Sequence, residues 1–245
     1  MSGHSKWSTI KRKKGANDAA RAKIFTKIGR EIAVCVKEGG PDPAANAKLR
    51  DLIQKAKQNN VPNDNIDRII KKAAGDGEKN NYESAVYEGY GPSGIAVIVE
   101  TLTDNRNRTA GDIRHYFDKF GGNMGQPGCV SFMFNQKGVI VIGNDGLDEE
   151  KVMDDVMTAG ADDFTYSEDA IEVVTDPTAF SEVRDALESM GYTFASAQIE
   201  QVPSTYTSID DPETRTKMSR LLEALDDNDD VQEVWHNWEN PDEEE

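Results

Sequence analysis

Apolar residues in the first third of the chain recur every three or four positions, the spacing that lines one face of a helix. The first stretch predicts a helix over residues 18–37, which a pair of glycines ends. A second helix is expected to be capped by Asp42 and opened by Pro43, because proline is tolerated in a first turn. A third ends at Gly75. The three apolar faces comprise Ile24, Phe25, Ile28, Ile32, Cys35 and Val36, then Leu49, Leu52, Ile53 and Ala56, and then Ile66, Ile69, Ile70 and Ala73. Residues 1–75 are therefore predicted to hold a three-helix bundle.

The pattern changes after residues 75–81 (GDGEKNN), which contain no apolar side chain and are predicted to be a linker. Beyond this point apolar residues gather in short runs typical of strands. These runs lie at 85–88, 95–102 and 130–134. A helix is expected between the last two runs, opened by a capping box of Thr109 and Asp112 and ended by two glycines.

Residues 137–200 are predicted to form a compact unit of their own. Its strand-like runs lie at 139–142, 164–166, 171–174 and 194–202. A helix over 148–159 separates the first two runs, and a helix that begins at Asp176-Pro177 separates the last two. The order β-α-β-β-α-β is the ferredoxin-like plan.

The chain on both sides of this unit can supply a second ferredoxin-like sheet. Residues 95–134 provide one β-α-β segment, and residues 202–238 provide another if 202–209 form a strand. The predicted fold class is α+β, with an N-terminal three-helix bundle followed by two ferredoxin-like α/β domains, the second inserted in the first. The domain boundaries are predicted at 1–75, at 82–135 plus 202–240, and at 137–200.

Charge is distributed unevenly along the 245 residues, which carry a net −17. Residues 1–80 hold 18 Lys and Arg against 9 Asp and Glu, a net +9, whereas residues 81–245 hold 10 against 36, a net −26. Within the first thirty residues nine cations face one acid, Asp18. Such a segment attracts a polyanion, because each cation that meets a phosphate releases a condensed counterion. We therefore expect nucleic-acid contacts to be concentrated in the N-terminal part.

The candidate contacts in this basic start include a tryptophan and a histidine among the cations. They are His4, Lys6, Trp7, Lys11, Arg12, Lys13, Lys14, Arg21, Lys23, Lys27 and Arg30. Trp7 can stack on a base or anchor the arm on its own domain. The competing interpretation of the run is a solvated tail, the common fate of clustered like charges.

A second candidate contact is the loop before the helix that follows residue 102. Asn105, Arg106, Asn107 and Arg108 place two arginines and two amides at the entry to that helix. The free N–H groups of a helix start favour an anion, and arginine provides a fork suited to phosphate. The alternative is that the two arginines neutralise neighbouring acids, and both interpretations stand.

No residue pattern nominates a catalyst. The run Gly89–Gly94 matches G-x-G-x-x-G but precedes a strand, so it is expected to be a strand-to-strand connection and no dinucleotide site. The clustered acids are expected to be solvated faces and helix caps, and Cys35 and Cys129 to be core residues. We therefore predict a protein that is not an enzyme, with no catalytic residues, no metal, no cofactor and no small-molecule substrate. With no apolar run of about 18 residues, we predict no membrane contact. Because the two cysteines are typical of a reducing compartment, we predict a cytoplasmic location.

Five short motifs resemble the YebC/PmpR family. They are Gly3-His4-Ser5-Lys6-Trp7, Ile24-Phe25-Thr26-Lys27, Tyr87-Glu88-Gly89-Tyr90-Gly91-Pro92, Asp104-Asn105-Arg106-Asn107-Arg108-Thr109 and Gly121-Gly122-Asn123. The resemblance spans essentially the whole length. The family is usually described as probable transcriptional regulatory proteins and includes the mitochondrial translational activator of cytochrome c oxidase. Ser93 stands where many members have glycine, so a slight difference in that turn is expected.

The resemblance implies a helical N-terminal domain and two α/β domains. It also implies cytoplasmic DNA binding and gene regulation for bacterial members, and action on translating ribosomes for others. Two functions therefore compete: a DNA-binding transcriptional regulator that uses the basic arm, and a ribosome-associated translation factor that places the arm on ribosomal RNA. No helix-turn-helix recognition helix with base-reading residues at its start stands out, which favours RNA slightly. A pure protein adaptor would leave the basic arm without a purpose.

Overall fold

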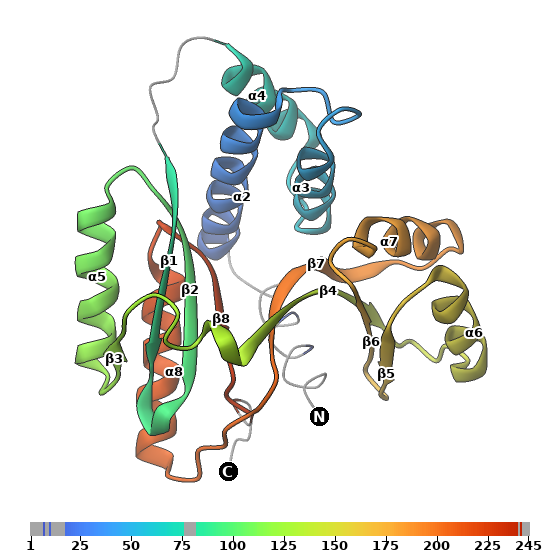
Figure 1. The fold of residues 1–245 in the computed structure, drawn as a ribbon. Coiled ribbons are helices and arrows are strands. Elements are labelled where there is room, and N and C mark those ends of the chain that lie inside the picture. The colour runs from blue at the N-terminus through green and yellow to red at the C-terminus, as the bar shows by residue number, and fades with distance from the viewer. Residues whose placement is uncertain (1–6, 8–9, 11–17, 76–81, 240, 242–245) are drawn as a thin grey trace.

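The computed structural model describes residues 7, 10, 18–75, 82–239 and 241. Of the predicted contact residues, His4, Lys6, Lys11, Arg12, Lys13 and Lys14 lie outside this part of the chain. Figure 1 shows a helical bundle at the top and two sheets below it, each with helices on one face.

The bundle consists of α2 (Asp18–Gly39), α3 (Ala47–Gln58) and α4 (Asn63–Ala74). Its core is formed by the predicted apolar faces, with Ile32, Leu49 and Ala56 completely buried. The second helix begins later than predicted. Asn46 is its cap, because the Asn46 side chain accepts a hydrogen bond from the Leu49 N–H, while Asp42 instead accepts from the Ala44 N–H and closes a turn before the helix.

The first sheet contains β1 (Glu83–Tyr90), β2 (Ala96–Thr103), β3 (Asn123–Met124) and β8 (Val231–His236). These strands are antiparallel neighbours in the order β3-β1-β2-β8. The helices α5 (Arg106–Lys119) and α8 (Pro212–Asp227) cover one face. Phe117, Met218 and Leu221 are fully buried there against Val97 and Val99.

The second sheet contains β4 (Phe134–Gly143), β5 (Asp163–Tyr166), β6 (Ala170–Thr175) and β7 (Phe194–Pro203), in the order β5-β6-β4-β7. The helices α6 (Glu149–Ala159) and α7 (Phe180–Ser189) pack on one face. All pairs are antiparallel, so the predicted ferredoxin-like plan is confirmed, as is the α+β fold class. Phe134 and Pro203 pair with each other, so the chain enters and leaves this sheet at one point.

The predicted composition of the first sheet is wrong in one respect. Residues 202–209 do not form its missing strand, because β7 keeps residues up to Pro203 in the second sheet and Thr207 makes only an isolated bridge to Trp238. The hairpin strand β1 takes that place. The connection between β1 and β2 is the short helix η1 (Pro92–Gly94), as expected for a strand-to-strand turn. Ser93 has φ 56° there, a backbone conformation that favours glycine.

Three local predictions are also corrected. Residues 131–133 form a 3-10 helix, η2 (Ser131–Met133), because Met133 N–H bonds to Val130 O, and the sheet strand is β3 instead. The capping box at Thr109 is wrong, because Asn105 caps α5 and Thr109 lies within the helix. The helix expected from Asp176 begins at Phe180, since the Asp176 carboxylate accepts from Thr178 N–H in a preceding turn.

Candidate nucleic-acid interface

The predicted cations Lys23, Lys27 and Arg30 lie on the side of α2 that faces the end of α8. Ile28 and Ile32 turn into the bundle core, and this orientation directs Lys23, Lys27 and Arg30 outward. They meet residues 226–230 (DDNDD), which end α8 and lead into β8; we call these residues the acidic segment. The cations predicted to contact nucleic acid thus contact acids about 200 residues further along the same chain.

Both side-chain and main-chain oxygens of the acidic segment receive these cations. Lys23 Nζ lies 2.7 Å from Asp227 Oδ1, and this hydrogen bond raises the pKa of Lys23. Lys27 Nζ donates to the carbonyl oxygen of Asp226 at 2.7 Å, and Arg30 Nη1 donates to that of Asp229 at 2.6 Å. Arg21 is exposed near the start of the same helix.

The end of α8 explains why cations collect there. The last turn of a helix carries unsatisfied carbonyls and partial negative charge, so acids are unfavourable in it. Nevertheless α8 ends in Asp226 and Asp227 and has no basic residue in its last turn. The lysines of α2 supply the missing positive charge and donate to the free carbonyls, so α2 completes the end of α8 from another part of the fold.

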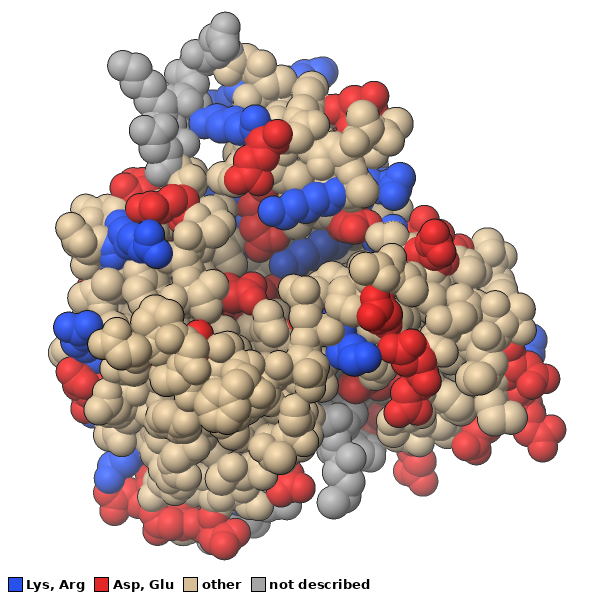
Figure 2. Space-filling model, viewed as in Figure 1, with Lys and Arg blue, Asp and Glu red and all other residues tan. Residues whose placement is uncertain are grey.

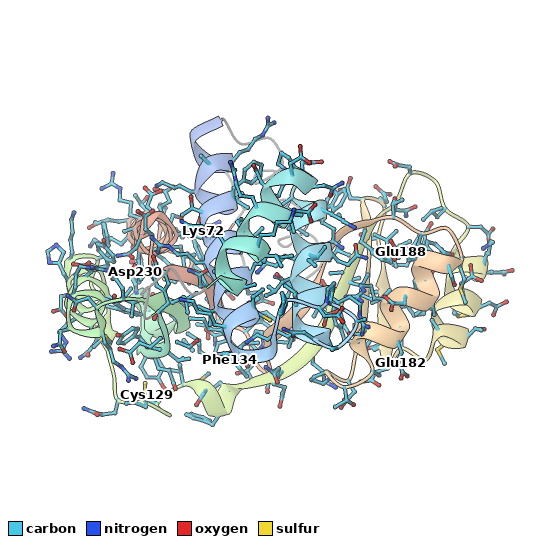
Figure 3. All side chains as sticks on the ribbon, turned by 90° about the horizontal axis from the view of Figure 1, so that it is seen from above. Lys72, Cys129, Phe134, Glu182, Glu188 and Asp230 are labelled. Atoms are coloured by element: carbon cyan, nitrogen blue, oxygen red, sulfur yellow. The ribbon has the colours of Figure 1, made fainter. Side chains whose placement is uncertain are left out.

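Asp230 joins the two predicted contact regions. Its buried carboxylate accepts from Arg108 Nη2 at 2.6 Å, from Thr109 Oγ1 at 2.8 Å and from Arg30 Nη1 at 3.3 Å. Burial alone would raise the pKa of Asp230, but the hydrogen bonds from Arg108 and Thr109 outweigh it and hold the pKa below its usual value. Figure 3 shows Asp230 on the side of the bundle where α8 lies.

The central loop is largely engaged within the fold. Asn105 caps α5 by accepting from the Arg108 N–H at 3.1 Å, and Arg108 also pairs with Asp104 at 2.8 Å. Arg106 is 3.7 Å from Glu83, with more than half of each side chain exposed, and Asn107 is exposed. Arg108 therefore has the contacts of the neutralising interpretation, although all four residues, Asn105, Arg106, Asn107 and Arg108, are exposed.

Trp7 lies on the face of the second sheet opposite α6 and α7. Together with Ile10 it packs against Val139 and Val141, and its indole ring lies over Gly143, where a Cβ atom would be 3.1 Å away. The sequence left two roles open for Trp7, stacking on a base and anchoring the arm, and this packing corresponds to the anchoring role.

The bundle exposes further cations that the sequence analysis did not nominate. Figure 2 shows Lys and Arg side chains across the bundle, whereas acids dominate the edges of the sheets below. Arg50, Lys57, Arg68 and Lys71 are all exposed on α3 and α4. The sequence pattern that could have identified these cations is their position on the sides of the two helices opposite the apolar faces.

Ion pairs also attach the bundle to both sheets. Lys55 of α3 lies between two carboxylates, 2.9 Å from Glu233 of β8 and 3.4 Å from Glu31 of α2. Burial alone would lower the pKa of Lys55, but the two acids outweigh it and raise the pKa. On the other side of the bundle, Arg184 of α7 reaches Asp51 of α3 at 2.6 Å. A cleft of about 410 Å³ separates α2 and α3 from β7 and β8.

Among the described residues, no three or more His, Cys, Asp and Glu side chains are grouped so that they could hold a metal ion. No helix in this part of the chain is long and apolar enough to cross a membrane.

Comparison with known proteins identifies the family. Residues 5–76 match the model of the TACO1/YebC protein N-terminal domain, and residues 82–238 match that of the TACO1/YebC second and third domain. A "Probable transcriptional regulatory protein" from Ruminiclostridium cellulolyticum is 58% identical over 100% of this chain and 99% of its own, and one from Acetivibrio thermocellus is 57% identical over 97% and 99%. The crystal structure of a conserved hypothetical protein from Aquifex aeolicus superposes with a TM-score of 0.83 at 44% identity, covering 92% of this chain and 93% of that one. The chain belongs to the TACO1/YebC family.

Proposed function

We propose that this protein is a non-enzymatic regulator of gene expression that acts in the cytoplasm and binds nucleic acid through its basic N-terminal segment. The observation that carries the proposal is the separation of charge, net +9 in residues 1–80 against −26 in residues 81–245. An acidic body repels phosphate, so binding must be concentrated where the cations are. The name that the bacterial relatives carry, probable transcriptional regulatory protein, supports the regulatory part.

The proposed contacts are to the phosphate backbone. Lys11, Arg12, Lys13 and Lys14 are consecutive and have no acid nearer than Asp18 to pair with. Contacts of this kind position a protein on nucleic acid without specifying bases. The proposed binding is therefore strong at low salt and weakly dependent on sequence.

The first prediction tests the arm. Replacing Lys11, Arg12, Lys13 and Lys14 together by Gln should reduce the slope of log K against log salt by roughly 3–4, about one per lost phosphate contact. Binding is measured on duplex DNA and on a structured RNA at several salt concentrations. A matched variant with Lys119, Lys137, Lys151 and Lys217 replaced by Gln removes the same charge from the sheet domains and should leave the slope unchanged. An unchanged slope in the arm variant would exclude this role.

A second candidate is a translation factor that binds ribosomal RNA. A helix-turn-helix regulator places the start of a recognition helix in the major groove of DNA. The start of α4 is unsuited to this role, because Asp64 and Asp67 are exposed there and the DNA phosphates would repel them. This observation favours the second candidate. Cross-linking in cells followed by sequencing of the bound nucleic acid separates the two candidates. Recovered ribosomal RNA selects the second, and recovered promoter DNA selects the first.

A further inference from the structure

The acidic segment occupies the cations that a nucleic acid would need on α2. Lys23, Lys27 and Arg30 each already hold an oxygen of residues 226–230 at 2.6–2.7 Å. A lysine ammonium or arginine fork that donates to these oxygens has hydrogen bonds that a phosphate would have to replace. A phosphate can bind one of these cations only after the contact between that cation and the acidic segment has broken.

We infer that the acidic segment competes with nucleic-acid phosphates for the α2 cations, so that the structure is the self-neutralised, closed form of the proposed interface. The inference rests on the proposed function and adds a means of regulating it. Because Lys23, Lys27 and Arg30 are engaged in the closed form, we expect other cations of the basic start to bind nucleic acid first. Separation of α2 from the segment then adds Lys23, Lys27 and Arg30 to the contact surface.

The burial of the individual pairs divides the contact into two parts. The side chains of Asp226 and Asp227 are 59% and 77% exposed, so their ion pairs with Lys27 and Lys23 are weak and easily exchanged for phosphate. The Asp230 side chain is 8% exposed and also holds Arg108 and Thr109. The outer pairs can therefore open while Asp230 keeps the first sheet intact.

The sequence of α8 supports a purpose for these acids beyond stability. Two aspartates in the last turn are unfavourable for the helix itself, and Asp229 adds a further exposed charge beside Lys23. Two other ion pairs of the bundle, Lys55 to Glu233 and Arg184 to Asp51, are largely buried. The pairs of Lys23 and Lys27 with the exposed Asp227 and Asp226 are therefore the ones that another polyanion can displace most easily.

The test neutralises the acids and leaves the cations in place. In one variant Asp226, Asp227 and Asp229 become Asn. A matched control replaces Glu150, Asp154 and Glu188 by Gln, Asn and Gln, which changes the net charge equally on exposed positions of α6 and α7; Figure 3 places Glu188 on the opposite side of the bundle from Asp230. Affinity for a labelled duplex DNA and a labelled RNA hairpin is measured by fluorescence anisotropy. The acidic-segment variant should bind roughly three- to thirtyfold more tightly than the control, from the usual strength of two exposed pairs.

A second background shows whether the acids act through α2. With Lys23, Lys27 and Arg30 replaced by Gln, the same three Asn substitutions should give no gain over the control. Equal affinity of the acidic-segment variant and the control would overturn the inference, as would a gain that persists without the three cations. The single variant Asp227→Asn, which loses only the Lys23 pair, should show a smaller gain in the same direction if the triple variant fails to fold. Failure of the unaltered protein to bind either probe would instead remove the proposed function and the inference with it.

Discussion

At the residue scale, Asp230 determines how the helical bundle and the first sheet meet. One carboxylate receives Arg108 and Thr109 from α5 and Arg30 from α2. A buried charge of this kind is stable only while its partners remain, because each removed partner leaves the carboxylate or an arginine unsatisfied. Asp230 therefore has a structural role that the exposed Asp226 and Asp227 do not share.

Replacing Asp230 by Asn should lower the free energy of unfolding at pH 7 by about 1.5–3 kcal/mol, the value of a hydrogen bond to a charged group. The folded-state pKa of Asp230 lies below its ordinary value of 3.8. Its contribution is therefore fully present above the unfolded-state pKa and is lost as the pH falls through the folded-state pKa. Denaturant unfolding at a series of pH values checks this, and a difference between the two proteins that persists at pH values well below 3.8 would contradict it.

At the element scale, the ends of the helices are decided by single hydrogen bonds. Asn46 accepts from the Leu49 N–H and donates to the carbonyl oxygens of Cys35 and Gly40, so one buried side chain starts α3 and holds the end of α2. The side chain of Asp42, the residue that the sequence suggested, accepts one exposed hydrogen bond, from the Ala44 N–H. The two positions offer a direct comparison of a real cap with an expected one.

Asn46→Ala should destabilise the protein by about 1–2 kcal/mol, the upper part of the range for a lost helix cap, because the side chain is also buried. Asp42→Ala removes only the exposed contact and should change stability by less than about 0.5 kcal/mol. Thermal and urea unfolding of the two variants measure the difference. A larger effect at Asp42 would show that the turn before α3, rather than the cap, limits stability.

At the scale of the whole molecule, the charges are arranged so that the basic bundle rests on two acidic sheet units. The Phe134–Pro203 pairing brings the ends of the second sheet together, which is the geometry of an inserted unit. The division into 1–75, 82–135 plus 202–240, and 137–200 remains a prediction, and protease accessibility tests it.

Limited proteolysis should cut first within residues 75–81, which have no apolar side chain to bury, or within the first fifteen residues, near the end of the chain. The fragments are identified by mass spectrometry over a time course at low protease concentration. Fragments that begin near residue 82 and end near residue 240 are the expected early products. Early cleavage inside 137–200 would contradict the nested arrangement.

The sequence by itself determined the features that depend on neighbours along the chain. The apolar stripes of α2, α3 and α4 and the β-α-β-β-α-β order of residues 137–200 were predicted because helix and strand spacing are local properties. The cap at Asn46 was missed because Asp42-Pro43 is an equally good local signal. No local pattern indicated the structural role of Glu88, whose buried carboxylate accepts from the N–H groups of Gly128, Val130 and Ser131.

Tertiary structure decided the features that depend on partners far apart in sequence. The place of β8 beside β2 was decided by hydrogen-bond pairing between segments far apart in the chain, which no local pattern encodes. The position of Trp7 over Gly143 was decided by packing against a strand that lies far along the chain. The contacts of Lys23, Lys27 and Arg30 with the acidic segment span about 200 residues, and charge counting along the sequence could not separate a cation held by an aspartate from one available to a phosphate. Only the folded chain brings the two segments together, and the short range of ion pairs in water makes that proximity decisive.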